Sequence, residues 1–325
     1  MPSTPPATPD PAAPDPTPAP APAPLPSPAP SGGLRWDVET FGTPGRLRAV
    51  WGSGPHDVYA VGDGGVIVHS TGDGRWTALK SGLSDDLHGL WGAGPDEIYV
   101  VGAVQMPDWT GSVLRSTDRG ATWSVARNAG ALHASVWGTA GDDVYIADYH
   151  ALYHSNDHGT SWTSIALPKL DVYAVWGAGR DDVFAVGNNL LNQQTVVQSR
   201  DHFASYSATQ PGNPDGLLAV WGSSATDVWA VGAPGSIYHS TDDGATWANL
   251  TPAGDIGGLV GVWGAGPDDV YAVGGRGNAL HTADGGKTWT TVTLPSHDSL
   301  SGIWGSGNKD IYIVGGAGQI LHGHE

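Results

Sequence analysis

The chain repeats one pattern, which first reads Val50-Trp51-Gly52 and, after a short turn, Asp57-Val58-Tyr59-Ala60-Val61-Gly62. The Trp-Gly pair returns at Trp91, Trp137, Trp176, Trp221, Trp263 and Trp304, with gaps of 40, 46, 39, 45, 42 and 41 residues. Seven copies at a period near 40, built from strand-like segments, predict an all-β fold. We expect a single seven-bladed β-propeller of four-stranded antiparallel blades.

The fifth copy shows how one blade is built. Its predicted strands, each bounded by Gly, Pro, Asp or Ser, are residues 217–222, 227–232, 236–240 and 245–250. Several are apolar at successive positions, and successive side chains of a strand point to opposite faces. Both faces must therefore be buried, as they are when a blade lies between two others. No stretch has a convincing 3.6-residue apolar period, so almost no helix is expected.

The two ends of the domain complement each other. The seventh copy begins at Trp304, reaches a third strand at residues 319–322 and has no fourth strand before Glu325. Residues 34–39 precede the first Trp-Gly, and Trp36 stands where fourth-strand tryptophans stand in other copies. Pairing of these segments would close the ring and remove two open sheet edges.

A second pattern, S-x-D-x-G-x-x-W, falls between the third and fourth strands. It spans residues 116–123, 155–162 and 240–247, with Thr for Ser at 282–289 and a shortened form around Asp73; blade 4 keeps Ser199 and Asp201 but has Phe203 and Tyr206 for Gly and Trp. Over nearly all of 46–325 the chain resembles the Asp-box (BNR) repeats of sialidases, sortilin-type receptors, some glucanases and photosystem II assembly factors. The resemblance implies a structural role in capping turns, and no activity, for Asp73, Asp118, Asp157, Asp201, Asp242 and Asp284.

Composition divides the chain into two parts. Residues 1–33 hold 14 of the 25 prolines and no aromatic residue, which predicts a disordered or polyproline tether; 34–325 form the propeller. The net charge of −18 argues against nucleic acid and anionic lipid as partners, and no apolar run is long enough for a membrane span. A Pro-rich leader is typical of exported proteins, so we expect an extracellular or cell-envelope monomer whose export signal is not in this chain, with the cytoplasm as the alternative.

Repeated polar residues have structural explanations. Histidines recur at equivalent positions on separate blades, which would keep them apart around the ring: His69, His154, His239, His281 and His322. We therefore expect a repeated structural role for them, and no metal or cofactor. Acidic residues after each Trp-Gly are explained by turn formation, with calcium binding at some of them as the lesser alternative.

The loops between the second and third strands depart from the repeat in blades 2, 3 and 4, and strand parity puts them on one face. The candidate ligand-binding residues in these loops are Trp109, Asp108, Tyr149, His150, Asn188, Asn189, Gln193 and Gln194. Aromatic rings and amides suit a carbohydrate or a protein partner. We favour a non-catalytic binding or scaffolding module, with loop drift as the competing interpretation. The alternative function is an Asp-box glycoside hydrolase, which would need a carboxylate pair from residues such as Asp108, Asp148 and Asp171.

Overall fold

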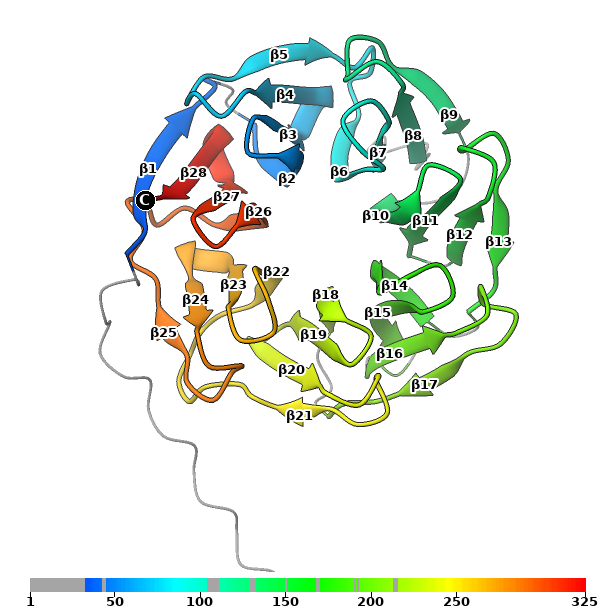
Figure 1. Ribbon diagram of the computed structural model, residues 1–325. Coiled ribbons are helices and arrows are strands. Elements are labelled where there is room, and N and C mark those ends of the chain that lie inside the picture. Colours follow the sequence, from blue (N-terminus) through cyan, green and yellow to red (C-terminus); the bar gives the residue numbers. More distant parts are fainter. Residues whose placement is uncertain are drawn as a thin grey trace, which may run out of the picture.

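The computed structural model describes residues 33–42, 45–103, 111–128, 133–149, 151–167, 170–189, 191, 193–212 and 216–325. In these ranges 28 strands form seven four-stranded antiparallel sheets, arranged as blades around a central axis (Figure 1). The predicted seven-bladed β-propeller is confirmed. Residues 1–32 of the predicted tether, 1–33, lie outside the described residues.

Each blade is one meander, and the blades follow the chain in order. Blade 1 comprises β2 (Leu47–Gly54), β3 (Asp57–Gly62), β4 (Val66–Ser70) and β5 (Thr77–Lys80); blade 2 comprises β6 (Asp86–Gly92), β7 (Ile98–Ala103), β8 (Gly111–Ser116) and β9 (Ser124–Asn128). Blade 3 comprises β10 (His133–Ala140), β11 (Asp143–Asp148), β12 (Ala151–Ser155) and β13 (Thr163–Ile165); blade 4 comprises β14 (Leu170–Gly177), β15 (Val183–Asn189), β16 (Gln194–Ser199) and β17 (Ser207–Thr209). Blade 5 comprises β18 (Leu217–Ser224), β19 (Asp227–Gly232), β20 (Ser236–Ser240) and β21 (Ala248–Asn249); blade 6 comprises β22 (Leu259–Gly264), β23 (Val270–Gly274), β24 (Ala279–Thr282) and β25 (Thr290–Thr291).

Blade 7 joins the two ends of the chain. It comprises β26 (Leu300–Gly307), β27 (Asp310–Gly315), β28 (Gln319–His324) and, as its outermost strand, β1 (Arg35–Thr40). The pairing of β1 with β28 is antiparallel, and Figure 1 shows the blue β1 outside the red β28 at the rim. Trp36 covers Gly323 so closely that a Cβ there would lie 2.8 Å from the indole ring. The predicted closure of the ring is confirmed.

The core lies between blades. The described residues form seven apolar clusters, and each cluster draws from two neighbouring blades. In β3, for example, Tyr59 and Val61 pack with blade 2, whereas Val58 and Ala60 pack with blade 7. Burial of both faces explains why these strands are apolar at successive positions.

The repeated Trp-Gly pair makes a second ring of contacts between blades. Each tryptophan lies over the glycine of the following blade: Trp51 on Gly92, Trp91 on Gly138, Trp137 on Gly177, Trp176 on Gly222, Trp221 on Gly264, Trp263 on Gly305 and Trp304 on Gly52. A Cβ added to any of these glycines would lie 2.3 to 2.8 Å from the indole. Glycine is required at this position because no other residue leaves room for the ring.

The recurring histidines make the same contacts in each of their blades, which supports the predicted structural role. Their Nε2 atoms lie 2.6 to 2.8 Å from an aspartate at or beside the start of the second strand, and their rings stack on the aromatic residue of that strand at centroid separations of 3.8 to 4.4 Å. In blade 5, for example, His239 bonds to Asp227 and stacks on Trp229. The acidic residues thus hold the histidine of the third strand as well as shaping the turn.

The S-x-D-x-G turns also form a repeated hydrogen-bond network. In blade 2, Asp118 accepts the Ser116 hydroxyl and both the backbone N–H and the hydroxyl of Thr122, at 2.8, 2.8 and 2.5 Å. The Ser116 hydroxyl oxygen in turn accepts the backbone N–H of Gly120. Equivalent networks surround Asp157, Asp201, Asp242 and Asp284. Asp73 makes a smaller turn and accepts the N–H of Arg75.

Blade 4 keeps this network despite its altered sequence. Phe203 stands at the glycine position with a φ of 62°, is buried, and packs 6.1 Å from the ring of Tyr145 in blade 3. In the other blades the motif tryptophan packs against the preceding blade, as Trp247 does against blade 4. Tyr206, at the tryptophan position, is instead 43% exposed. Phe203 therefore fills the space between blades that a motif tryptophan fills elsewhere.

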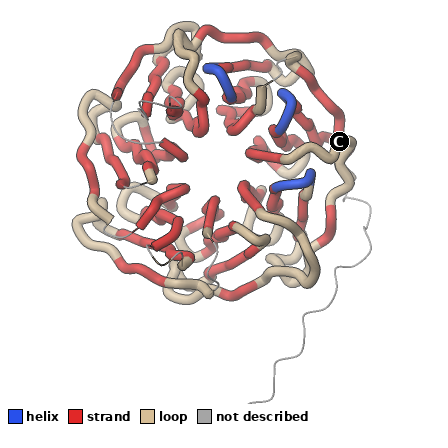
Figure 2. Tube along the Cα trace, turned by 180° about the vertical axis from the view of Figure 1, so that it is seen from behind, coloured by secondary structure: helices blue, strands red, loops and turns tan. Residues whose placement is uncertain are grey.

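The propeller has two different faces. Antiparallel order puts the turns between first and second and between third and fourth strands on one face, which we call the turn face. The loops between second and third strands lie on the other, the loop face. Three of these loops, on blades 1, 6 and 7, contain short 3-10 turns, at Asp63–Gly65, Gly275–Gly277 and Gly316–Gly318 (Figure 2). The fourth strand of blade 5 is shorter than predicted, at two residues. In the described part of the chain, no helix is long and apolar enough to cross a membrane.

Candidate functional site: the mouth of the central channel

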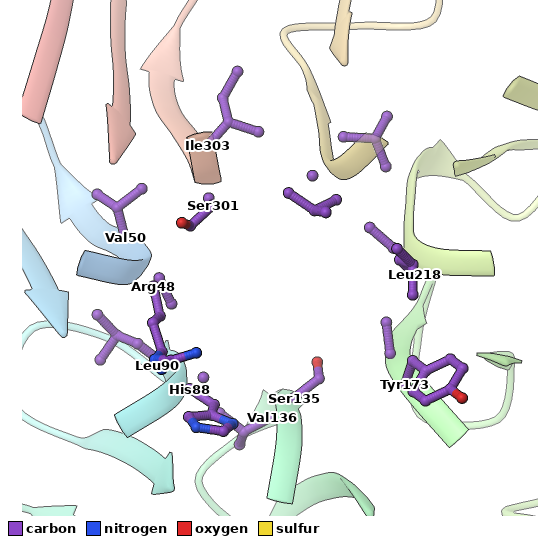
Figure 3. Close-up of a pocket in the computed structure, with 18 of the residues that line it drawn as sticks. Arg48, Val50, His88, Leu90, Ser135, Val136, Tyr173, Leu218, Ser301 and Ile303 are labelled. Atoms are coloured by element: carbon purple, nitrogen blue, oxygen red, sulfur yellow. The ribbon is translucent and has the colours of Figure 1, made fainter. Parts of the chain in front are cut away.

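The first strands of all seven blades line a central cavity of about 220 Å³ (Figure 3). Among the described side chains, three consecutive positions before Trp-Gly contribute to its wall in six blades and two positions in blade 3. The residues directly before tryptophan are all branched and aliphatic: Val50, Leu90, Val136, Val175, Val220, Val262 and Ile303. The residues one step earlier are all small: Ala49, Gly89, Ser135, Ala174, Ala219, Gly261 and Gly302. The side chains at these two levels are alike in all seven blades and, apart from Ser135, are apolar.

The third position differs in every blade for which its side chain is described. It holds Arg48, His88, Tyr173, Leu218, Val260 and Ser301. In all seven first strands the register with the second strand shifts by one residue at this position. Such a β-bulge leaves the extra residue unpaired and redirects its side chain. The bulges thus aim the six variable residues named above at the channel.

A second cavity, of about 280 Å³, forms the mouth of the channel on the loop face. The variable residues line it together with Arg46 and Tyr149. Blades 7, 1 and 2 contribute the polar groups, namely Ser301, Arg46, Arg48 and His88; blades 3 to 6 contribute Tyr149, Tyr173, Leu218 and Val260. Figure 3 shows Arg48, His88 and Ser301 across the opening from Tyr173 and Leu218. The mouth therefore has one polar wall that carries two arginines and one aromatic, aliphatic wall.

Hydrogen bonds hold the two arginines in the polar wall. Arg48 Nε donates to Asp63 Oδ1 at 2.6 Å, and its Nη2 donates to Asp86 Oδ2 at 3.3 Å. Arg46 Nε donates to the hydroxyl of Ser301 at 2.7 Å, across the junction of blades 1 and 7. Arg48 is thus ion-paired to two carboxylates. Among the described residues, no carboxylate bonds to the guanidinium of Arg46.

Two further side chains have shifted proton affinities. Burial lowers the pKa of His88, and the nearby Arg48 lowers it further, so the imidazole is held neutral at pH 7. Burial also raises the pKa of Tyr173, and the negative charge of Asp171 adds to that effect. Tyr173 packs edge-on against Tyr149, with ring centroids 5.2 Å apart. The mouth thus offers a neutral imidazole and a pair of tyrosine side chains beside the arginines.

The structure brings only one of the described, sequence-predicted ligand residues into this mouth, namely Tyr149. Asn189 bonds to Gln193 within its own loop, Nδ2 to Oε1 at 2.9 Å, and Gln194 is 1% exposed and donates to Ser236 of blade 5. Asn188 is also buried. Asp108, Trp109 and His150 lie outside the described residues.

The carboxylates considered for hydrolysis are differently placed. Asp148 is buried at the end of β11, and Asp171 lies in β14 opposite Asn188. At the mouth itself, Asp63 and Asp86 both bind the guanidinium of Arg48. These two carboxylates form an ion-paired rim around one arginine, unlike the facing acid and base of a glycoside hydrolase.

The residues of the mouth other than Tyr149 were not predicted, although the sequence holds a signal for them. Aligned on Trp-Gly, the repeats are uniform at the two positions before tryptophan and vary at the third. In a repeat protein, variation at one position within a constant framework is typical of a binding surface.

Comparison with known proteins supports the fold. No family model and no curated protein matches the chain. Among solved structures, YCF48 bound to a D1 peptide matches with a TM-score of 0.73 and 18% identity, covering 93% of this chain and 99% of that one. Virginiamycin B lyase from Staphylococcus aureus matches with a TM-score of 0.73 and 12% identity, covering 90% of this chain and 99% of that one.

The GH74 xyloglucanase from Xanthomonas campestris matches with a TM-score of 0.70 and 18% identity, covering 88% of this chain and 53% of the enzyme. This chain therefore spans about half of the enzyme's length. Identities this low establish a shared propeller fold and nothing more specific.

Proposed function

We propose that this protein is a non-catalytic binding module that takes a short peptide segment of a partner protein at the channel mouth on its loop face. The observation that carries the proposal is the division of the mouth into a polar wall with two arginines and an aromatic, aliphatic wall. A peptide presents carboxylates and apolar side chains within a few ångströms of each other, so it can satisfy both walls at once.

Arg46 is the residue best placed to bind a carboxylate. A guanidinium has five N–H donors, and the described residues engage its Nε through Ser301. The remaining donors can bind a carboxylate in the bidentate geometry that arginine favours. Opposite it, Tyr149 and Tyr173 offer aromatic surface of the kind enriched in protein interfaces. The aliphatic level below limits how deep a ligand can enter.

Two further observations support a binding role. A protein of the same fold, YCF48, has been solved with a D1 peptide bound, so a propeller of this shape can bind a peptide. The repeated turn network around Asp118 and its equivalents supports assigning the repeats to the Asp-box type, in which the aspartates stabilise the fold. We therefore propose that the aspartates serve the scaffold and the bulge residues serve the ligand.

The test is a selection of random peptides on the full chain, followed by affinity measurements on variants. Peptides chosen by the wild type should lose roughly 10- to 100-fold in affinity with Arg46→Ala or Tyr173→Ala, the range expected for an anchor residue. Arg276→Ala is the matched control, since Arg276 lies on the same face, in the 3-10 turn of blade 6, and pairs with Asp255. It should leave the affinity unchanged.

Two results would overturn the proposal. Selected peptides that bind Arg46→Ala and Tyr173→Ala as tightly as the wild type would place the site elsewhere. A parallel glycan screen that yields ligands dependent on Tyr149 and Tyr173, with no peptide selected, would assign the mouth to carbohydrate, which an aromatic pair also suits. Melting curves of each variant show whether it is folded.

A further inference from the structure

A cluster on the turn face has no counterpart in the other repeats. His154 and Asp143 of blade 3 form one of the repeated pairs, and His202 from the third-to-fourth-strand turn of blade 4 lies beside them. One potential ligand atom from each of the three residues lies within 4.8 Å of the others. At the position of His202 other blades carry Arg119, His158, Asp243 and Gly285. Within the described residues, two histidines and a carboxylate meet in this way only between blades 3 and 4.

The local geometry leaves a nitrogen of His202 available to the cluster. Its Nε2 lies 2.8 Å from Asp181 Oδ1, and its Nδ1 lies 3.3 Å from the hydroxyl of Tyr145. If Nε2 donates to Asp181, Nδ1 carries the lone pair. A carboxylate that fixes the tautomer of a histidine in this manner is the usual support for a histidine that binds metal. The rings of His154 and His202 are nearly parallel, at 23°, with centroids 5.8 Å apart.

The carboxylate of the cluster is buried and bonds to one of the two histidines. Asp143 is fully buried and accepts hydrogen bonds from His154 and Thr139. A cation entering between His154 and Asp143 would replace the proton that they share at 2.8 Å.

We propose that Asp143, His154 and His202 form a binding site for a divalent transition-metal ion of the zinc type. Two imidazole nitrogens with one carboxylate oxygen suit zinc, whereas calcium and magnesium prefer oxygen ligands. Zinc bonds of about 2.0–2.1 Å in a tetrahedral site place ligand atoms roughly 3.3 Å apart, so the cluster must contract slightly. His202 can supply this movement because its side chain is 42% exposed and lies on a turn.

Such a metal would join two neighbouring blades. Asp143 and His154 belong to blade 3 and His202 to blade 4, at the same interface where Phe203 replaces a packed tryptophan. An ion that binds only the folded form stabilises it in proportion to the logarithm of its concentration. The ion would therefore stabilise this interface.

The test is titration of the tag-free full chain with zinc by calorimetry, with Co²⁺ absorption to report the coordination geometry. The wild type should bind one zinc at this site, and its melting temperature should rise with zinc, fall again with EDTA and be unaffected by calcium. His202→Asn should weaken zinc binding by about tenfold or more and abolish the rise. Asparagine is chosen because His202 has a φ of 55°, a conformation that Asn tolerates.

His158→Asn is the matched control. His158 stands at the same turn position in blade 3, has a φ of 57° and bonds to Glu97, but this carboxylate also binds Arg115, which stands where a second histidine would be needed. This variant should bind zinc as the wild type does. The proposal is overturned if the wild type does not bind zinc, if His202→Asn keeps full affinity, or if His158→Asn loses as much. His324→Asn, near the C-terminus, should have no effect; loss of all binding there would assign the metal to that end.

Discussion

His322 Nδ1 lies 2.9 Å from Glu39 Oε1, a contact between side chains 283 residues apart in the chain. The other oxygen of Glu39 accepts Trp76 Nε1 of blade 1 at 2.7 Å, and His322 Nε2 meets Asp310 Oδ1 at 2.7 Å. One buried carboxylate thus connects the strand that closes the ring to the C-terminal strand and to the next blade.

The His322–Glu39 contact should make the stability of the ring depend on pH. Burial alone would lower the pKa of His322, but hydrogen bonds with Glu39 and Asp310 outweigh burial and raise it. A histidine whose pKa is raised by folding stabilises the fold fully at pH values below its pKa in the unfolded chain, which is near 6.5. This stabilisation is lost as the pH rises through the pKa of the histidine in the folded protein. Urea unfolding from pH 5.5 to 9 should therefore show the advantage of the wild type over His322→Gln shrinking with pH. Parallel curves would contradict this.

Because β1 closes the ring, two truncations of the N-terminus should have different effects on stability. Removing residues 1–40 deletes β1, Trp36 and Glu39, and should lower the free energy of unfolding by about 3 kcal/mol or more, the scale for losing one buried aromatic side chain. Removing residues 1–32 leaves β1 in place and should not change the melting temperature. Equal melting temperatures for the two truncated proteins would show that β1 does not stabilise the ring.

The contact of Trp304 with Gly52 can be tested with two neighbouring glycines of β2. A Cβ on Gly52 would lie 2.6 Å from the indole of Trp304 and 2.7 Å from the backbone oxygen of Asp57, whereas a Cβ on Gly54 would meet nothing within 4 Å. Gly52→Ala should cost about 1–3 kcal/mol by overpacking, measured by urea unfolding, and Gly54→Ala should be nearly neutral. A similar loss for both would point to backbone flexibility instead.

In blade 4 the buried Phe203 stands at the motif glycine position and the exposed Tyr206 at the tryptophan position. We therefore expect the effects of mutating these two residues to be coupled. Phe203→Gly relieves a positive φ but opens a cavity, so we expect a net loss of about 2 kcal/mol. Tyr206→Trp should not raise the free energy of unfolding, because Phe203 still fills the space between the blades. The double variant restores the repeat pattern and should be more stable than the sum of the single effects by about 1–3 kcal/mol. Additive free energies of unfolding would mean that the two side chains do not share the space.

The turn aspartates should contribute to acid stability. Hydrogen bonds from the Ser161 hydroxyl and backbone lower the pKa of Asp157 to about 2, from the ordinary 3.8. A carboxyl group whose pKa is lowered by folding stabilises the fold at pH values above its pKa in the unfolded chain. This stabilisation is lost as the pH falls through the pKa of the group in the folded protein. Between about pH 4 and 2 the wild type should therefore lose stability that Asp157→Asn never had. If both proteins show the same acid unfolding curve, the network does not depend on the charge.

Much of the architecture was predictable because it repeats locally. The Trp-Gly period predicts seven blades, the paired apolar positions predict burial on both faces, and the missing fourth strand predicts closure by the segment around Trp36. Each of these features depends on strand periodicity and on residues within one repeat or at the two ends. The structural role of His239 and its equivalents also follows from their even spacing.

The repeats show where residues vary, but which way these side chains point depends on contacts between strands and between blades. A β-bulge is a property of the register between two strands, so only the paired structure shows that Arg48 and Tyr173 are directed into the channel. The contact of His202 with His154 likewise arises between blades. So does the packing of Phe203 in a space that a tryptophan fills in other blades. The amides of the blade-4 loop show a related effect, because Asn189 and Gln193 bond to each other once the loop folds. Local periodicity determines which strands form, whereas packing between blades determines which side chains are left to face a ligand.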